Sequence, residues 1–167
     1  YFKLQSFIFM PVFGLTNGMI PIIAYNYGAR NQKRIVQTIK LSTIISVSIM
    51  TVGTIIFQTI PEFLLVKLFD ASPQMVEIGV PALRIISLCF IIAGFCIVFG
   101  SVFQAMGNGV YSLIVSVCRQ LLTILPLAYI FAVVFGLHMV WWSMPAAEFV
   151  SLAVSVTLLR RIYKQKI

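Results

Sequence analysis

Residues 80–104, VPALRIISLCFIIAGFCIVFGSVFQ, form a long apolar run in which Arg84 is the one charged side chain. A helix rises about 1.5 Å per residue, so about 20 such residues cross the roughly 30 Å of a bilayer's hydrocarbon. Four further runs of this kind cover residues 2–24, 38–60, 110–135 and 139–159. All five are continuously apolar rather than alternating, which excludes membrane-spanning strands. The pattern predicts an all-α integral membrane protein, a polytopic bundle of about five transmembrane helices.

The overall composition supports the same class. Hydrophobic residues make up 60% of the chain and charged residues 10%, and the mean hydropathy is +1.04. So little polar surface cannot cover a water-soluble globule.

The basic residues mark the orientation. Eight of the 12 lie in the first loop and the C-terminal tail, which fall on one side if the spans alternate: Arg30, Lys33, Arg34, Lys40, Arg160, Arg161, Lys164 and Lys166. The connection over residues 61–79 carries three of the four acidic residues against one lysine. The positive-inside rule then predicts a multi-pass protein of the cell (inner) membrane with a cytoplasmic C-terminus. Topology thus explains the net charge of +8, and these short loops offer no nucleic-acid docking surface.

The chain opens directly into an apolar run at Tyr1, without a signal peptide's charged region and cleavage site. We therefore expect further helices upstream of Tyr1 in the complete protein.

Helix-weakening residues interrupt the first span: Pro11, Gly14, Gly18 and Pro21. Because proline cannot donate a backbone hydrogen bond, we expect this helix to kink, with Asn17 near the break. Two interpretations remain open: the small residues permit close helix packing, or the broken span lines a transport pathway. Gly28 is expected to end this helix in the left-handed conformation.

Metal and enzyme sites find little support in the residues. Cys89, Cys96 and Cys118 lie inside apolar spans, and His138 stands alone in a turn. Neither convergent metal ligands nor a disulfide framework is predicted. We expect no cofactor and no enzymatic activity, since convergent carboxylates or a nucleophile with its base are missing from the pattern.

The connections carry their own signals. Residues 61–69 could form a short interfacial helix, and Asp70 to Pro73 is typical of a helix start with Ser72 as N-cap. Tight turns are expected at 107–109 and 136–138, which would make the last three helices antiparallel neighbours.

Four segments in register carry a family resemblance. Residues 24–29, AYNYGA, followed by Arg34, resemble the cytoplasmic end of the eighth span of multidrug and toxic compound extrusion (MATE) transporters. Residues 103–108, FQAMGN, Arg119 with Pro126, and residues 145–148 agree with the family in order and spacing.

The resemblance implies that the chain is the last five of twelve spans, most of one lobe of a two-lobe transporter. Its partners would then be the missing N-terminal lobe of the same chain, a small-molecule substrate, a proton or sodium ion and the lipid bilayer. Such proteins exchange drugs, organic cations and other amphipathic compounds for protons or sodium. Some sodium-coupled members carry an acidic residue in the tenth span. The corresponding run here carries Arg84 instead, so we expect the ion-binding residues upstream of Tyr1.

The candidate pathway residues are the polar side chains in or beside the spans: Asn17, Tyr25, Asn26, Arg84, Gln104, Arg119 and Glu148. The candidate hinges are Pro11, Pro21, Pro126 and Pro145. Tyr25 could equally belong to an interfacial aromatic belt.

Glu148 lies near the middle of the bilayer, where an unpaired charge costs about 3 kcal/mol. Counting residues from the outer ends of the spans places Arg84 within reach and Arg119 about 12 Å deeper. The sequence thus predicts that Glu148 pairs with Arg84, directly or through a bridging water. Its role could be to stabilise the lobe or to act in proton-linked gating.

Two alternatives to an exporter are a flippase for lipid-linked sugars and a non-transporting membrane subunit. A flippase would need a strongly cationic cavity, for which Arg84 and Arg119 are the candidates. A subunit would bury polar residues without a shared cavity.

Overall fold

The computed structural model describes residues 2–69 and 72–166, and every regular element in them is helical. The elements are α1 (Phe2–Gly28), α2 (Gln32–Thr59), α3 (Pro61–Phe69), α4 (Pro73–Ser87), α5 (Phe90–Ala105), α6 (Gly109–Val117), the π-helix η1 (Cys118–Ile124), α7 (Leu125–Val134), the 3₁₀-helix η2 (Leu137–Trp142) and α8 (Ser143–Lys166). Four helical stretches are long and apolar enough to span a membrane, and the bent pair α4 and α5 makes a fifth. The predicted all-α membrane bundle is confirmed.

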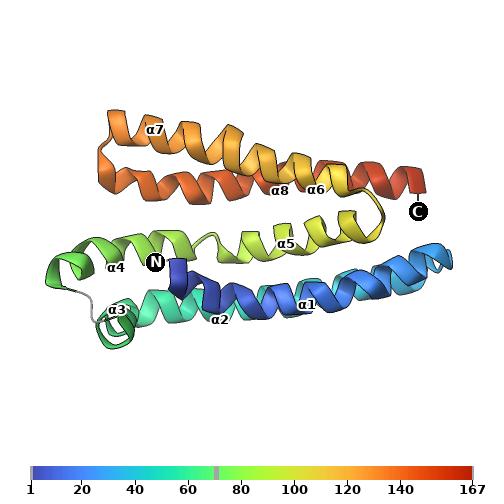
Figure 1. The fold of residues 1–167 in the computed structure, drawn as a ribbon, viewed down its shortest axis with the longest axis horizontal. Coiled ribbons are helices and arrows are strands. Elements are labelled where there is room, and N and C mark those ends of the chain that lie inside the picture. The colour runs from blue at the N-terminus through green and yellow to red at the C-terminus, as the bar shows by residue number, and fades with distance from the viewer. Residues whose placement is uncertain (1, 70–71, 167) are drawn as a thin grey trace.

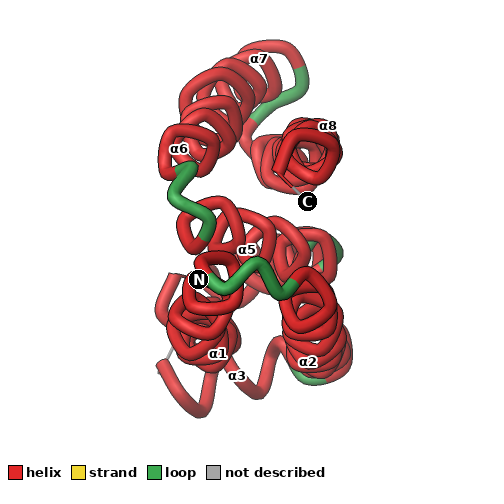
Figure 2. The backbone as a smooth tube through the Cα atoms, turned by 90° about the vertical axis from the view of Figure 1, so that its right-hand side faces the viewer, coloured by secondary structure: helices red, strands yellow, loops and turns green. Residues whose placement is uncertain are grey.

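The spans form three tiers (Figures 1 and 2). The α1–α2 hairpin packs against α5 in the middle tier, and α8 with the α6–η1–α7 span covers the other side of α5. The α1–α2 loop, the α5–α6 turn and the C-terminus lie at one end, and α3 and the α7–α8 connection lie at the other (Figure 1). The basic loop and the basic tail therefore share one end of the bundle, as the alternating spans predict.

The core divides into two clusters along α5. One lies towards the C-terminal end of the bundle and centres on Phe103, and the other lies towards α3 and centres on Phe90. The Phe90 ring meets the rings of Phe9 and Phe57 edge to face, both at 5.3 Å between ring centroids. Aromatic contacts of this geometry add to the packing beyond buried area.

The third span is broken, which the sequence did not predict. Helices α4 and α5 meet at Leu88 and Cys89 with a bend of 53°. Side chains of α2 reach the carbonyl groups at this break. The Thr54 hydroxyl shares its hydrogen between the carbonyl of Ser87, at 3.0 Å, and that of Met50 on its own helix, at 2.9 Å. Gln58 donates to the carbonyl of Arg84 at 2.9 Å. Backbone groups must be paired away from water, so these two donors make the bend tolerable at this depth.

The fourth span contains the π-helix η1, which was also unforeseen. The Thr123 hydroxyl donates to the carbonyl of Cys118, five residues back, at 2.8 Å, and the Leu125 amide bonds the carbonyl of Gln120 with the same spacing. Pro126 follows as the second residue of α7, inside a helical span that is continuous from Gly109 to Val134. Pro126 therefore lies where the π-helix gives way to an α-helix.

The other prolines lie inside or near the start of helices. α1 runs through Pro11 and Pro21 without a break. Pro145 lies in the first turn of α8 and so does not open the backbone at Glu148. The residue with a left-handed backbone after α1 is Arg30, with φ 54°, and not Gly28 as predicted.

The predicted helix start at the third span is confirmed, because the Ser72 side chain accepts a hydrogen bond from the Met75 amide and Pro73 begins α4. Asp70 lies outside the described residues. Residues 61–69 form the predicted short helix, α3. The two tight turns contain glycines with positive φ, Gly107 at 75° and Gly136 at 89°, a conformation that residues with a side chain rarely adopt.

Candidate functional site

A polar cavity of about 260 Å³ lies where α1, α5, α6, η1 and α8 meet. Its lining residues are Phe13, Thr16, Asn17, Ile20, Cys96, Ile97, Gly100, Ser101, Gln104, Ser112, Val115, Ser116, Arg119 and Ser151. Three predicted pathway residues, Asn17, Gln104 and Arg119, thus meet at one site. Gln104 is held there by donating its side-chain amide to the Ser112 hydroxyl at 3.1 Å.

Helical spacing brings the polar lining to one face of each span. Ser112, Ser116 and Arg119 are four and three residues apart, and residues at such spacing share a face. Sequence reasoning missed both of these serines and also Ser151. The signal that could have found them is the recurrence of small polar residues every three or four positions in an otherwise apolar span.

Glu148 pairs with Arg119 and not with Arg84, so the predicted ion pair was wrong. Nη1 of Arg119 donates to Oε1 of Glu148 at 2.9 Å, with side-chain exposures of 34% and 11% respectively. The pair joins η1 to α8 at the edge of the cavity that Arg119 lines. A long arginine side chain and a carboxylate in this geometry form a charge-assisted hydrogen bond.

Two irregular segments explain the error. Between the turn at Gly136 and Glu148 the chain passes through the six residues of η2, which advance it roughly 2.0 Å each along the helix axis. The first turns of α8 then rise about 1.5 Å per residue. Glu148 therefore lies about 20 Å below the turn, and Arg119 no more than about 24 Å below it. The long arginine side chain spans the remaining difference in depth between the two residues.

Arg84 lies on the far side of the 53° bend, on α4, and its side chain is exposed. The main-chain carbonyl of Arg84 lies near the bend and accepts the hydrogen bond from the Gln58 side chain. The straight third span assumed from sequence would have placed Arg84 along the same line as the cavity residues of α5.

The second carboxylate oxygen of Glu148 has no hydrogen-bond partner among the described residues, although Glu148 is only 8% exposed. The hydroxyl of Ser151, three residues later on the same face of α8, is also buried and also without a partner there. The Cys96 thiol on α5 lies beside both groups, as the nearest weak hydrogen-bonding partner that α5 offers them. Buried polar groups are normally paired, so this cluster calls for a functional explanation.

The remaining pathway candidates lie elsewhere. Tyr25 is 78% exposed near the end of α1, and Asn26 donates its side-chain amide to the carbonyl of Ile22 on its own helix at 2.8 Å. Neither lines the polar cavity. The exposed position of Tyr25 fits the interfacial interpretation.

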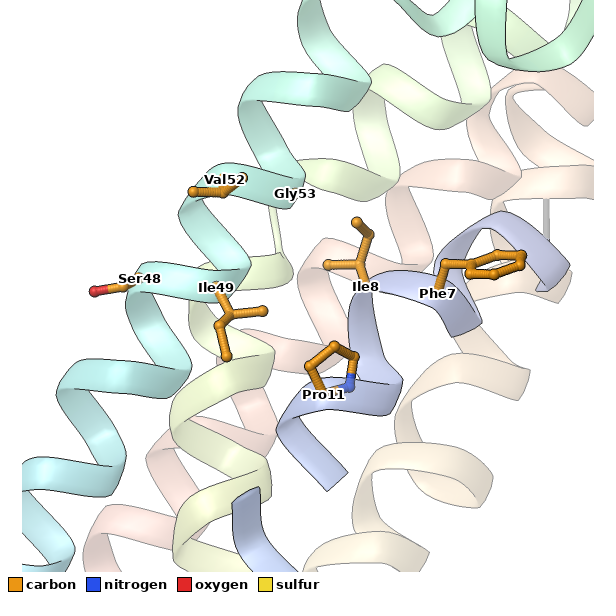
Figure 3. Close-up of a pocket in the computed structure, with 7 residues that line it drawn as sticks. All are labelled: Phe7, Ile8, Pro11, Ser48, Ile49, Val52 and Gly53. Atoms are coloured by element: carbon orange, nitrogen blue, oxygen red, sulfur yellow. The ribbon is translucent and has the colours of Figure 1, made fainter. Parts of the chain in front are cut away.

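A second hollow, of about 310 Å³, lies between α1 and α2 and is almost entirely apolar (Figure 3). Phe7, Ile8, Pro11, Ile49 and Val52 line it, and Ser48 points away from α1. The Ser48 hydroxyl bonds its own helix at the carbonyl of Ile44. This hollow therefore offers no polar recognition group.

Clustered histidine, cysteine or carboxylate ligands for a metal ion do not occur in the part of the chain that the structure describes. The chemistry that the polar cavity can perform is therefore hydrogen bonding from neutral side chains and electrostatic interaction with the Arg119–Glu148 pair.

Comparisons with known proteins match this architecture to one group of transporters. The chain is 29% identical over 147 residues to the multidrug export protein MepA of Staphylococcus haemolyticus, covering 88% of this chain and 32% of the relative. It resembles the solved structure of the MATE multidrug transporter DinF-BH in a ligand complex, with a TM-score of 0.86 and 33% identity, over 95% of this chain and 35% of that one. An inward-facing MATE family transporter of the MOP superfamily shares the fold at 18% identity, with a TM-score of 0.87 over 99% of this chain and 40% of that one.

The chain spans about a third of the length of the relatives that it matches. These relatives are membrane transporters rather than enzymes. The MatE family model matches residues 1–130, most of the chain. The sequence resemblance is thereby confirmed, and the chain belongs to the MatE family of multidrug and toxic compound extrusion transporters.

Proposed function

We propose that this chain is the larger part of the C-terminal lobe of a secondary antiporter that exports organic cations or other amphipathic compounds in exchange for protons or sodium. The observation that carries the proposal is the polar cavity inside a membrane-spanning bundle, lined by Asn17, Gln104 and Arg119. Family membership and the names of the relatives, which include multidrug export proteins, support it.

The chemistry of the cavity suits amphipathic cargo. Hydroxyl and amide groups alternate with apolar side chains such as Phe13 and Ile20, and ligand sites of this mixed kind bind apolar molecules oriented by a few polar groups. Arg119 is neutralised by Glu148, while Arg84 is remote. A strongly cationic cavity, which a flippase for lipid-linked sugars would use, is therefore not favoured.

We further propose that an N-terminal lobe of the same chain completes the transport site in the cell membrane and that the basic loop and tail face the cytoplasm. Repeat-based transporters place the substrate at the interface of two bundles, which rock about it. Asn17 and Arg119 lie on spans that border the cavity, so they would face that shared site.

Transport by the complete protein tests this proposal. The full-length transporter, reconstituted in proteoliposomes, should move ethidium against its gradient when a proton or a sodium gradient of the opposite direction is imposed. Lack of movement under both gradients would refute antiport of organic cations. Abolition of transport by Asn17→Leu, but not by Tyr25→Leu, would support the cavity as the pathway.

A further inference from the structure

We propose that Glu148 is a proton-binding site of this lobe and that a proton on Glu148 excludes an organic cation from the adjoining cavity. The inference rests on the proposed export function and deepens it, because it assigns the proton to a residue of the last span. The sequence analysis expected the ion-binding residues upstream of Tyr1 and left a role of Glu148 in proton-linked gating open.

The first step concerns the carboxylate oxygen of Glu148 that Arg119 does not bond. Oε1 of Glu148 accepts the bond from Arg119, whereas Oε2 is buried without a partner among the described residues. A proton binds there by forming one O–H bond at Oε2, and it comes from and returns to water in the cavity. Ser151 Oγ, which also lacks a partner in the described part of the chain, lies one turn along the same face and can accept that O–H.

The second step is the charge balance. The titratable or charged groups that face Glu148 from the elements packed on α8 are Arg119 of η1, Cys96 of α5 and Cys89 at the start of α5. Arg119 is the charged group among them. With Glu148 ionised, the pair is neutral, and with Glu148 protonated, Arg119 stands as a net positive charge in the cavity wall.

The third step is the effect on cargo. A unit charge roughly 8 Å from a bound cation, at an effective dielectric constant of about 20, weakens binding by about 30-fold. By thermodynamic linkage, a bound cation makes proton binding at Glu148 less favourable by the same factor. A proton and a cation thus exclude each other, which is the coupling that exchange requires.

The fourth step is the mobility of the pair. Arg119 lies in η1, and π-helical turns within α-helices occur often at functional sites. Loss of the Glu148 charge weakens the bond that fixes this arginine, and its side chain is already 34% exposed. The charge is thereby free to turn further into the cavity.

The test is equilibrium binding of tetraphenylphosphonium, whose charge does not change with pH, to the purified full-length transporter at pH 5.5 and pH 8.5. We expect wild type to bind about 30-fold more weakly at the lower pH. Glu148→Gln should bind weakly at both pH values, because it mimics the protonated acid. Arg119→Gln/Glu148→Gln, which removes both charges, should recover tight binding at both pH values.

Glu77→Gln is the matched control, because Glu77 is an exposed acid on α4 and should leave the pH dependence intact. Wild-type affinity with unchanged pH dependence in Glu148→Gln would overturn the inference while leaving the export function standing. Tight binding that responds to sodium and not to pH would reassign the site to sodium. Failure of the wild type to bind at either pH would refute the organic-cation class itself.

Discussion

The bend in the third span depends on two side chains of α2, and removing them should destabilise the lobe. Thr54→Val deletes the hydroxyl that donates to the carbonyl of Ser87, and Gln58→Leu deletes the amide that donates to the carbonyl of Arg84 and to the Ser87 hydroxyl at 3.0 Å. Both changes conserve most of the side-chain volume. Any loss of stability therefore reports the hydrogen bonds rather than packing.

The magnitude follows from the depth and the number of bonds. Hydrogen bonds between membrane helices contribute about 0.6 kcal/mol on average and up to about 1.7 kcal/mol. Ser87 is fully buried, so its carbonyl gains no water when Thr54 is changed, and the upper part of that range applies. We expect a loss of about 1 kcal/mol for Thr54→Val and about 2 kcal/mol for the double variant.

Thermal denaturation of the full-length protein in detergent measures these losses, with an expected fall in Tm of about 2 °C for Thr54→Val and about twice that for the double variant. Thr51→Val is the matched control, because the Thr51 hydroxyl donates to the carbonyl of Val47 on its own helix, as the Thr54 hydroxyl also does to the carbonyl of Met50. The control therefore removes the bond within α2 but not the bond to the bend. If Thr54→Val and Thr51→Val lower Tm equally, the bond to Ser87 does not stabilise the bend and the reasoning fails.

Two further predictions concern packing and orientation. Gly53→Ala should destabilise the protein by about 1–3 kcal/mol, because a Cβ at Gly53 would overlap the Ile8 side chain across the α1–α2 contact (Figure 3). Gly14 has open space around it, so Gly14→Ala should be neutral or stabilising. Equal thermal stabilities of the two variants would contradict this prediction. In a cysteine-free background, Gln32→Cys should react with an impermeant maleimide only after the membrane is permeabilised, whereas Gln74→Cys should react in intact cells. The reason is that the starts of α2 and α4, where these residues lie, are at opposite ends of the bundle. Labelling of both positions from one side would refute the topology.

Composition and charge were enough to predict the class and the order of the spans. Continuous apolar runs leave few alternatives in a bilayer, and the basic clusters near Arg30 and Arg160 lie at the same end of the bundle, as predicted (Figure 1). The start of α4 was also predictable, since Ser72 and Pro73 are a local signal that tertiary contacts did not override.

The irregular backbone was not predictable in the same way. The bend at Leu88 contains no proline, and its stability comes from Thr54 and Gln58, which lie more than 25 residues away in sequence. The π-helix η1 likewise arises inside an ordinary apolar run. Depth counted at a constant rise per residue therefore failed for Glu148, which follows the 3₁₀-helix η2, and for Arg119, which lies in η1, and the wrong partner was chosen for Glu148.

The π-helix η1 and the buried polar atoms of Glu148 and Ser151 meet at one place. Arg119 lies in η1 and bonds Glu148 across the contact between η1 and α8. Irregular backbone at membrane depth is tolerated where protein or a wet cavity satisfies it, and the polar cavity adjoins η1 through Arg119. An ion pair that serves only stability needs no π-turn beside it, since straight helices can present such a pair. The coincidence of η1 with the Arg119–Glu148 pair therefore supports the proposed proton site.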